Sequence, residues 1–258
     1  MTSLGNFLRV RRQLPVYYFC NAGGAGMKVR QFRYGADNLG YILYTERSAL
    51  AVDGGAAQEM CAFIESEGLK LAIITNTHDH MDHTFGNRDL IDRTGAPFID
   101  NRTLLSGQTL ELDGEKIEVY HTPGHSEDSI CFRADNMVIT GDTLFNGTIG
   151  NCFTGDLEGF YHSIKTLLAL PDATIVYAGH DYARDSLAFA RHLEPENEAI
   201  QAFLKKYNPE HVFSTMEEER AMNPYLRFND PAIIALLERN GLPVATELER
   251  WNSLMRIG

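Results

Sequence analysis

The segment over residues 77–83 holds three histidines and two aspartates in seven positions, which is too polar for a core segment. Alternate residues of an extended loop point the same way, so His78 and His80 can converge on one ion. Asp82 and His83 lie where the chain turns into the next helix and can face a second ion. Imidazole and carboxylate groups at this density suit zinc, iron or manganese. A solvated turn is the alternative interpretation, and the residues farther along the chain count against it.

Three further side chains of the metal-binding types follow expected strands. They are His125 after Ile117–His121, Asp142 after Met137–Thr140, and His180 after Thr174–Ala178. With the strand Leu71–Thr75 before the first segment, four strands deliver such side chains at their carboxyl ends, as a rigid scaffold presents a site on loops. We interpret Asp79 and His121 as structural or supporting residues. The remaining histidines with no ligand partners in sequence are His162, His192 and His211.

The elements that must position these loops are short strands punctuated by turns, followed by helices. Beyond the four strands just named, we expect strands over Val29–Tyr34, Leu39–Thr45, Ala49–Val52, Pro97–Asp100, Thr109–Leu112 and Ser129–Arg133. Apolar spacing and stop signals predict helices over Ala56–Glu67, Leu157–Leu170, Tyr182–Leu193, Glu196–Lys206, Pro231–Asn240 and Thr246–Arg256. No strand is expected after about residue 195. The pattern predicts a mixed α/β core of two sheets faced by helices and a small helical subdomain.

Composition narrows the function classes. The chain has 258 residues, with 23 Lys and Arg against 35 Asp and Glu, a formal charge of -12. This sign disfavours nucleic-acid binding, and no apolar stretch approaches the roughly 18–20 residues of a membrane-spanning helix. The four cysteines form no CxxC pair, which favours a reducing compartment and predicts a cytoplasmic protein. Residues 1–26 are expected to be an extension rather than a secretory signal, because the run over residues 14–20 is short and broken by Pro15.

The ligand pattern resembles the metallo-β-lactamase superfamily and, within it, the glyoxalase II (hydroxyacylglutathione hydrolase) family. The similarity covers most of residues 27–230 and includes the segments 141–145, 179–182, 189–197 and 223–227. It implies an αββα sandwich over residues 27–195, followed by a helical subdomain over 196–258. It also implies two divalent metal ions, with zinc the leading metal and iron and manganese left open. The implied ligands are His78, His80 and His125 for the first ion, Asp82, His83 and His180 for the second, and Asp142 between them.

The resemblance further implies an enzyme that hydrolyses a small-molecule thioester, glutathione-derived in the family, with Asp82 and Asp142 as its catalytic carboxylates. Tyr182 matches a family substrate contact. The chain has Asn151 where the family usually has Lys and Phe153 where it usually has Tyr, and the helix near its end lacks the usual Arg and Lys pair. Each missing charged hydrogen bond could cost about 1.5–3 kcal/mol of binding. We therefore expect selectivity for glutathione to weaken more than hydrolysis itself.

Other functions stay open at this stage. A persulfide dioxygenase of the same superfamily uses a single iron, so the number of bound metal ions would separate it from the hydrolase. Lactone or ester hydrolysis is chemically accessible, because the same activated water attacks an ester carbonyl. A nuclease is disfavoured by the acidic charge, and a metal sensor by the complete ligand set. Both a monomer and a homodimer are compatible with the sequence.

Overall fold

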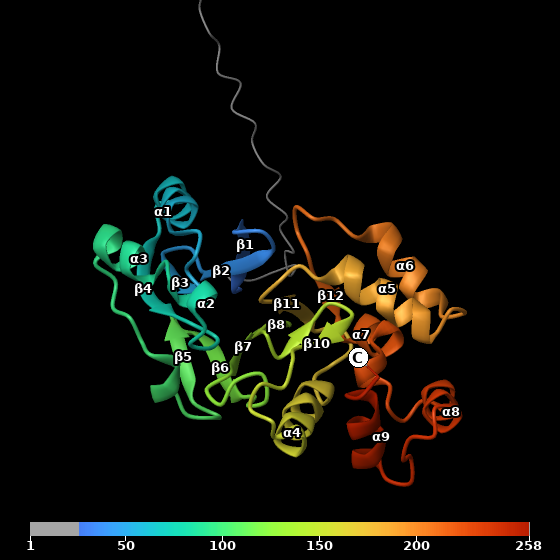
Figure 1. Ribbon diagram of the computed structural model, residues 1–258. Coiled ribbons are helices and arrows are strands. Elements are labelled where there is room, and N and C mark those ends of the chain that lie inside the picture. Colours follow the sequence, from blue (N-terminus) through green and yellow to red (C-terminus); the bar gives the residue numbers. More distant parts are fainter. Residues whose placement is uncertain (1–25, 258) are drawn as a thin grey trace, which may run out of the picture.

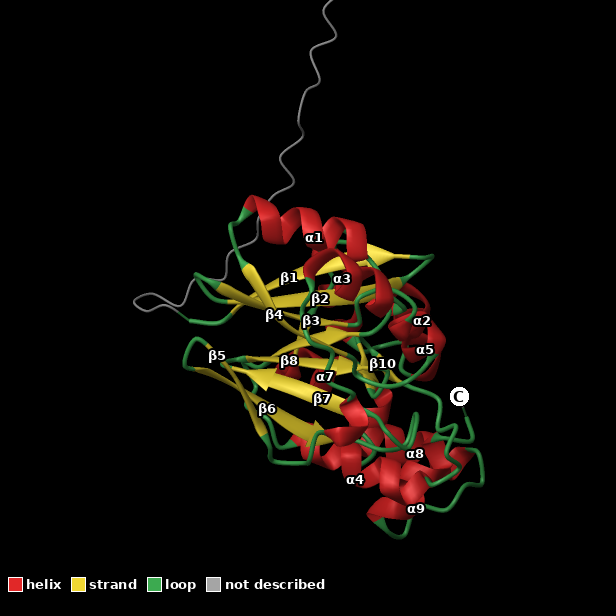
Figure 2. Cartoon of the chain, turned by 90° about the vertical axis from the view of Figure 1, so that its left-hand side faces the viewer, coloured by secondary structure: helices red, strands yellow, loops and turns green. Residues whose placement is uncertain are grey.

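The computed structural model describes residues 26–257 and places two β-sheets face to face (Figures 1 and 2). The predicted extension over residues 1–26 lies, except for Gly26, outside the described residues. The first sheet has the strand order β1-β2-β3-β4, and the second has the order β12-β11-β8-β7-β6-β5. The first consists of β1 (Lys28–Tyr34), β2 (Asn38–Tyr44), β3 (Ser48–Val52) and β4 (Lys70–Thr75). The second consists of β5 (Thr109–Leu112), β6 (Glu115–His121), β7 (Ile130–Ala134), β8 (Met137–Gly141), β11 (Ile175–Ala178) and β12 (Ser214–Thr215).

Helices cover the outer faces of both sheets, and a short hairpin leaves the second sheet. The hairpin consists of β9 (Leu144–Phe145) and β10 (Thr148–Ile149). The helices of the first half are α1 (Ala57–Ser66), α2 (Met81–Thr84), α3 (Asn87–Thr94) and α4 (Leu157–Leu168). Those of the second half are α5 (Ala183–Leu193), α6 (Glu198–Lys206), α7 (Met216–Met222), α8 (Pro231–Arg239) and α9 (Glu247–Leu254). Two 3-10 turns lie at Asn101–Thr103 and Pro224–Leu226. Within residues 26–257, none of the helices has the length and apolarity to cross a bilayer.

Strand alternation sorts the apolar side chains into layers. In β2, Leu39 and Tyr41 belong to the core between the two sheets, whereas Ile42 packs in the outer cluster beneath α1 and α3. On the opposite side, Phe160 and Ile164 of α4 pack against the outer face of the second sheet. Figure 2 shows α1 and α3 above the sheets and α4, α8 and α9 below them. The predicted αββα sandwich is therefore confirmed.

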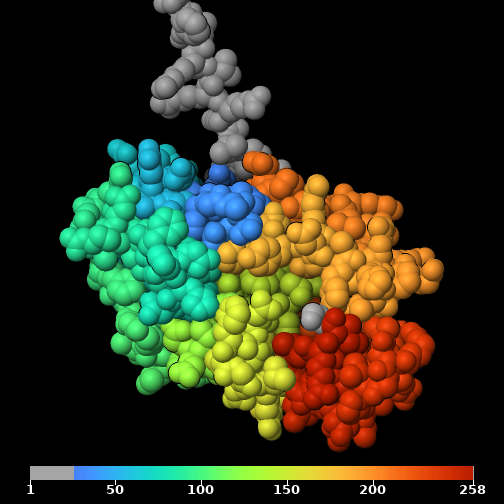
Figure 3. All heavy atoms as spheres, in the orientation of Figure 1, coloured from blue at the N-terminus to red at the C-terminus, as the bar shows by residue number. Residues whose placement is uncertain are grey.

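The C-terminal helices extend the outer layer of the second sheet. Trp251 of α9 is fully buried in the same apolar cluster as Phe160 of α4, and its indole Nε1 donates to the carbonyl of Leu157 at 3.0 Å. Figure 3 shows these helices, in red, beside α4 and below α5 and α6. A second cluster joins α5, α6 and Met222 of α7.

Two predicted features of the strands are wrong. Of the stretch Pro97–Asp100, only Phe98 forms a bridge, to Ile74 of β4, because Asp100 already caps the following 3-10 turn. A strand does follow residue 195, since β12 pairs antiparallel with β11 and ties the C-terminal part into the second sheet. The helices α3 and α7 and the β9–β10 hairpin also lie outside the predicted elements.

Strand direction explains where the polar loops meet. β3 and β4 are parallel, with α1 in their crossover, and β8 and β11 are parallel, with α4 in theirs. The carboxyl ends of parallel neighbours lie at one edge of a sheet, so the loops that follow β4, β8 and β11 gather together. The loop after β6 joins them from the neighbouring part of the second sheet.

Candidate metal centre

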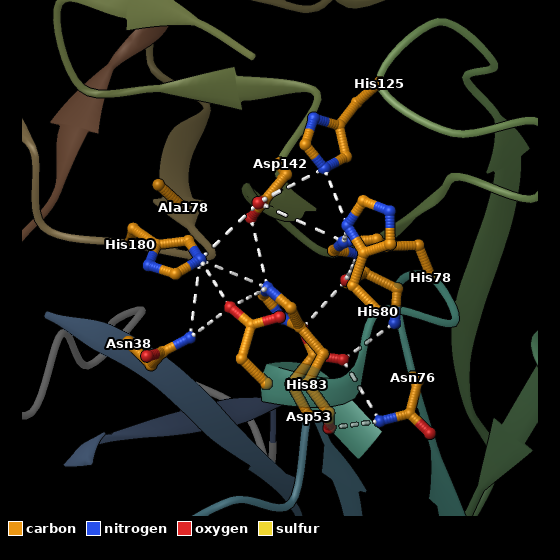
Figure 4. A network of polar contacts seen from close by, with 12 residues as sticks. Asn38, Asp53, Asn76, His78, His80, His83, His125, Asp142, Ala178 and His180 are labelled. Carbon is orange, nitrogen blue, oxygen red and sulfur yellow. Dashed lines mark hydrogen bonds and ion pairs between the residues drawn. The ribbon is translucent and has the colours of Figure 1, made fainter. Parts of the chain in front are cut away.

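The structure brings all seven predicted ligand side chains into one cluster, supplied by the loops after β4, β6, β8 and β11 (Figure 4). Three groups within it could each hold a metal ion, because their nitrogen and oxygen atoms lie within 4.8 Å of one another. These groups are His78, His80 and His125; His78, His83 and Asp142; and Asp82, His83 and His180.

The first predicted group consists of imidazoles alone. His80 Nδ1 lies 3.0 Å from His78 Nε2 and 3.1 Å from His125 Nε2, so three ring nitrogens converge. His78 and His125 are buried, which shields the nitrogens from water. Burial and the adjacent His83 ring lower the pKa of His78 to about 4, so this ring is neutral near pH 7.

The second predicted group mixes imidazole and carboxylate. His83 Nε2 lies 3.2 Å from His180 Nε2, and Asp82 Oδ2 lies 3.3 Å from the same His180 atom. The Asp82 side chain is 49% exposed, whereas both rings are buried. At His83 burial opposes the charged ring, but the Asp53 and Asp142 carboxylates outweigh it and raise the pKa to about 11.

Asp142 lies between the two groups. Its Oδ1 is 3.4 Å from His83 Nε2, and its Oδ2 is 3.5 Å from both His125 Nε2 and His180 Nε2. Burial would raise its pKa, yet the contacts with His180 and His83 hold the pKa well below the usual range. The carboxylate is therefore ionised, and its buried Oδ1 has no hydrogen-bond donor in the described structure.

The outer nitrogens of the rings face acceptors, and this fixes where the lone pairs point. Asp53 Oδ2 lies 3.0 Å from His83 Nδ1, Asp37 Oδ1 lies 2.8 Å from His180 Nδ1, and the carbonyl of Asn151 lies 3.1 Å from His125 Nδ1. A carboxylate or carbonyl can only accept, so each neutral ring carries its proton on Nδ1 and turns the Nε2 lone pair inward. Inward nitrogens about 3 Å apart need a cation between them, and the raised pKa of His83 means that a proton fills this role on that ring when no metal ion is bound. The residues present thus fit divalent metal ions.

Asp53 supports the cluster, and it was not predicted from the sequence as a site residue. It directly follows β3, with a positive φ of 56°, and accepts from the Thr77 backbone N–H at 2.8 Å as well as facing His83. Asn38 was also missed, and its Nδ2 donates to Asp82 Oδ2 at 2.9 Å. Asp37, beside His180, is the third such residue. The available signal was position: Asp53 follows the strand that pairs in parallel with the ligand-bearing β4.

The three predicted substrate residues border the cluster. The Tyr182 ring stacks on His180 with centroids 4.9 Å apart, and the Phe153 ring lies 5.1 Å from that of His125. Asn151 has an exposed side chain and reaches the cluster through its carbonyl.

The residues expected to be structural lie elsewhere or beneath the loops. Asp79 points away to Arg102 Nη1 at 3.1 Å, and His121 Nε2 donates to the carbonyl of Leu104 at 2.6 Å. His162, His192 and His211 belong to none of the three groups.

Two family models match this chain, and together they cover residues 97–254. Residues 97–180 match the model described as metallo-beta-lactamase superfamily, and residues 181–254 match the model described as hydroxyacylglutathione hydrolase C-terminus. The first match ends at His180, the last predicted ligand, and the second begins at Asp181, the residue before Tyr182.

Curated relatives and solved structures agree with these matches. The chain is 35% identical to the hydroxyacylglutathione hydrolase of Chromohalobacter salexigens, over 80% of this chain and 88% of the relative. It is 32% identical to that of Pseudoalteromonas translucida, over 88% and 95%. Among structures, ETHE1 from Myxococcus xanthus superposes with a TM-score of 0.65 at 22% identity, covering 89% of this chain and 90% of that one. The di-iron-bound form of TTHA1623 superposes with a TM-score of 0.57 at 22% identity, covering 76% and 100%. These structural likenesses show the fold.

Proposed function

The chain belongs to the hydroxyacylglutathione hydrolase family of metallo-β-lactamase-fold enzymes, and we propose that it hydrolyses S-acyl thioesters. In the reaction, water adds to the thioester carbonyl, the carbon–sulfur bond breaks, and a carboxylic acid and a thiol leave. The observation that carries the proposal is the convergence of seven inward-facing ligand side chains on the loops at one end of the sandwich.

We propose two divalent metal ions as the cofactor, with zinc the leading metal. His78, His80 and His125 would hold one, Asp82, His83 and His180 the other, and Asp142 would serve both. Imidazole nitrogen and carboxylate oxygen without thiolate suit zinc and equally admit iron or manganese. When bound, such ions supply a water of lowered pKa and polarise the carbonyl oxygen of the substrate.

The protein residues keep the ligands in one tautomer and handle the proton. Asp53 and Asp37 accept from the outer nitrogens of His83 and His180, which points both inner nitrogens into the cluster. A bound metal ion would displace the proton that the raised pKa of His83 otherwise keeps on that ring. Burial would raise the pKa of Asp82, but the hydrogen bond from Asn38 lowers it below its usual range. Asp82 is therefore an ionised, half-exposed carboxylate, suited to accept the proton of the attacking water and pass it to solvent.

The second ligand group favours this hydrolase over a single-iron oxygenase. Beside the first group lies a second, made of Asp82, His83 and His180. Asp53 contacts the outer nitrogen of His83, and Asp37 contacts that of His180. A centre with one ion would leave the Nε2 atoms of His83 and His180 at 3.2 Å with no metal ion to bind them. Ester and lactone hydrolysis stay within the same chemistry, because only the leaving group differs.

Four further predictions complete the proposal, on the compartment, the domains, the oligomeric state and the substrate. The protein is proposed to be cytoplasmic, because Cys61, Cys131 and Cys152 are free thiols, which suits a reducing compartment. The proposed division into a catalytic domain over 27–195 and a helical subdomain over 196–258 stays a prediction, as do the two alternatives of monomer and homodimer. The small-molecule substrate is proposed to be a thioester, with hydroxyacylglutathione as the first compound to assay.

The test is release of thiol from an S-hydroxyacylglutathione by zinc-loaded protein, followed with a thiol-specific dye, beside oxygen uptake with a glutathione persulfide. The proposal expects metal-dependent thiol release and no oxygen uptake. Oxygen uptake by protein holding one iron, with no thiol release from any thioester, would contradict it.

A further inference from the structure

Four large apolar side chains are exposed around the metal centre, and we name them the rim. They are Met81 at 80% exposure, Phe85 at 57%, Phe153 at 68% and Tyr182 at 37%. Two of them lie on or beside α2, one on the loop after β10, and one before α5. Figure 3 shows the corresponding teal, yellow and orange parts of the chain meeting on one face. Exposed apolar side chains that surround a few convergent polar groups are typical of a ligand site.

Rim residues contact the ligands on both sides of the centre. Phe153 lies 5.1 Å from the His125 ring and 6.1 Å from that of His80, so it borders the first group. Tyr182 stacks on His180 and borders the second. If the carbonyl of a thioester lay at the centre, the acyl and thiol parts of the substrate would each extend past one of these aromatic rings.

The loops that carry the predicted ligands lack Lys and Arg, the two side chains that usually bind carboxylates. Segments 76–86, 122–129, 142–156 and 179–183 hold no Lys or Arg. The nearest sequence neighbour with a cation is Arg184, whose guanidinium lies over the Tyr207 ring at 5.2 Å. Arg102, which reaches Asp79, is also bound to Asp100 at 2.7 Å.

Carboxylate recognition depends on such cations. A carboxylate bound to Arg or Lys is held by charge-assisted hydrogen bonds, which are about twice as strong as neutral ones. The carboxylates of these same loops already hold neighbouring cations, since Asp79 is paired with Arg102 and Asp181 with Arg33.

We propose that the rim selects thioesters whose acyl and thiol arms are apolar and carry no carboxylate, in preference to the dicarboxylate thiol glutathione. This inference rests on the proposed thioester hydrolysis and names its substrate class. Phe153 and Tyr182 are the specificity-determining residues, since each ring packs on a predicted ligand ring and remains partly exposed to solvent.

The test keeps the acyl group and the thiol skeleton fixed and esterifies the two carboxylates, which removes their negative charges. The kcat/KM of zinc-loaded protein is measured with an S-acylglutathione and with the same compound as its diethyl ester. We expect the diester to be hydrolysed with a kcat/KM at least about tenfold higher, as one charge-dependent interaction of about 1.4 kcal/mol implies. A kcat/KM for the acid form equal to or above that of the diester overturns the rim inference and leaves the hydrolase intact. Hydrolysis of neither compound overturns the proposed function and the inference with it.

A gain of charge tests the same inference in the opposite direction. Asn151→Lys adds a cation beside Phe153, because the Asn151 side chain is exposed, and it keeps the backbone carbonyl that contacts His125 Nδ1. We expect kcat/KM for the acid form to rise about tenfold and that for the diester to stay within about twofold. Gln58→Lys is the matched control, because it adds the same charge at an exposed position on α1 and should change neither value. Two results would contradict the inference: an equal rise of kcat/KM for the acid form in both variants, or no rise in Asn151→Lys. Either would mean that the missing cation at the rim does not limit binding of the carboxylates.

Discussion

Two buried polar clusters of this protein look alike in composition and differ in how their atoms are paired. In the metal centre, inner ring nitrogens and the Asp142 carboxylate face one another, and Asp142 Oδ1 has no donor. In the cluster of Asn146, Ser214, Glu219 and Asn223, which we name the junction cluster, the Glu219 carboxylate faces donors. Both Glu219 oxygens lie 3.1 Å from the Gly147 N–H, and Asn223 Nδ2 donates at 2.9 Å.

The difference separates a binding site from a structural network. Convergent acceptors without donors need an added cation, whereas a carboxylate surrounded by donors is already satisfied. The junction cluster joins α7 to the β9–β10 hairpin, because Asn223 Nδ2 also donates to the carbonyl of Thr148 at 3.1 Å. We therefore expect substitutions in the first cluster to change metal binding and activity, and those in the second to change stability.

The largest effect is expected from Asp142→Ala, which removes the carboxylate that serves both ligand groups. Metal occupancy and thioester hydrolysis should both fall to background, measured by elemental analysis and by thiol release. Asp79→Ala is the control, since Asp79 lies in the same motif but points to Arg102. Full activity of Asp142→Ala would contradict the claim that the metal centre, unlike the junction cluster, is needed for activity.

In the junction cluster, Glu219→Ala should lower the free energy of unfolding by about 2–4 kcal/mol, because buried donors lose their acceptor. The number of metal ions per folded chain should not change. Denaturant unfolding and elemental analysis give the two readouts. Glu217→Ala on the exposed side of α7 should alter stability by less than about 0.5 kcal/mol. Loss of metal from folded Glu219→Ala protein would show that the two clusters are not separate in function.

Asp53→Asn tests the support behind the second ligand group. The amide keeps the size of the side chain but no longer offers an anionic acceptor to His83 Nδ1. We expect metal affinity to fall about 10–100-fold, the usual effect of losing such a partner. Calorimetric metal titration measures it. An unchanged affinity would mean that the buried carboxylate is only structural, like Glu219.

The buried Glu219 carboxyl should also make the stability of the protein depend on pH. Burial raises the pKa of Glu219 to about 7 from 4.5. Between these values the folded state holds a proton that the unfolded state releases, so this group makes stability fall as pH rises, by at most about 1.4 kcal/mol per pH unit. Glu219→Gln should remove this contribution, so that its stability relative to the unaltered protein increases from pH 5 to pH 7. Parallel stability curves for the two proteins would contradict the assignment.

The sequence was enough to predict which side chains gather in the cluster, because metal binding needs particular side chains and these lie in one dense motif and at strand ends. His78, His125 and His180 stand out without any knowledge of the fold. The supporting carboxylates do not, because Asp37 and Asp53 are ordinary turn residues until the parallel pairing of β3 and β4 is known. Their role depends on tertiary contacts, which no local pattern encodes.

Elements with weak periodicity were missed for a related reason. α7 has the sequence MEEERAM, in which a capping box at Thr215 rather than an apolar stripe marks the start. β12 is two residues long and is defined only by its pairing with β11. The stretch at Pro97 was assigned as a strand on composition, and the cap at Asp100 ended it early.

The most direct test of the central claim is the number of divalent ions per chain in active protein, measured while zinc is added back to chelated protein. The account predicts that hydrolysis of a thioester appears with metal loading and reaches its maximum at two ions per chain. Full hydrolysis by metal-free protein, or saturation of both binding and activity at one ion, would contradict it.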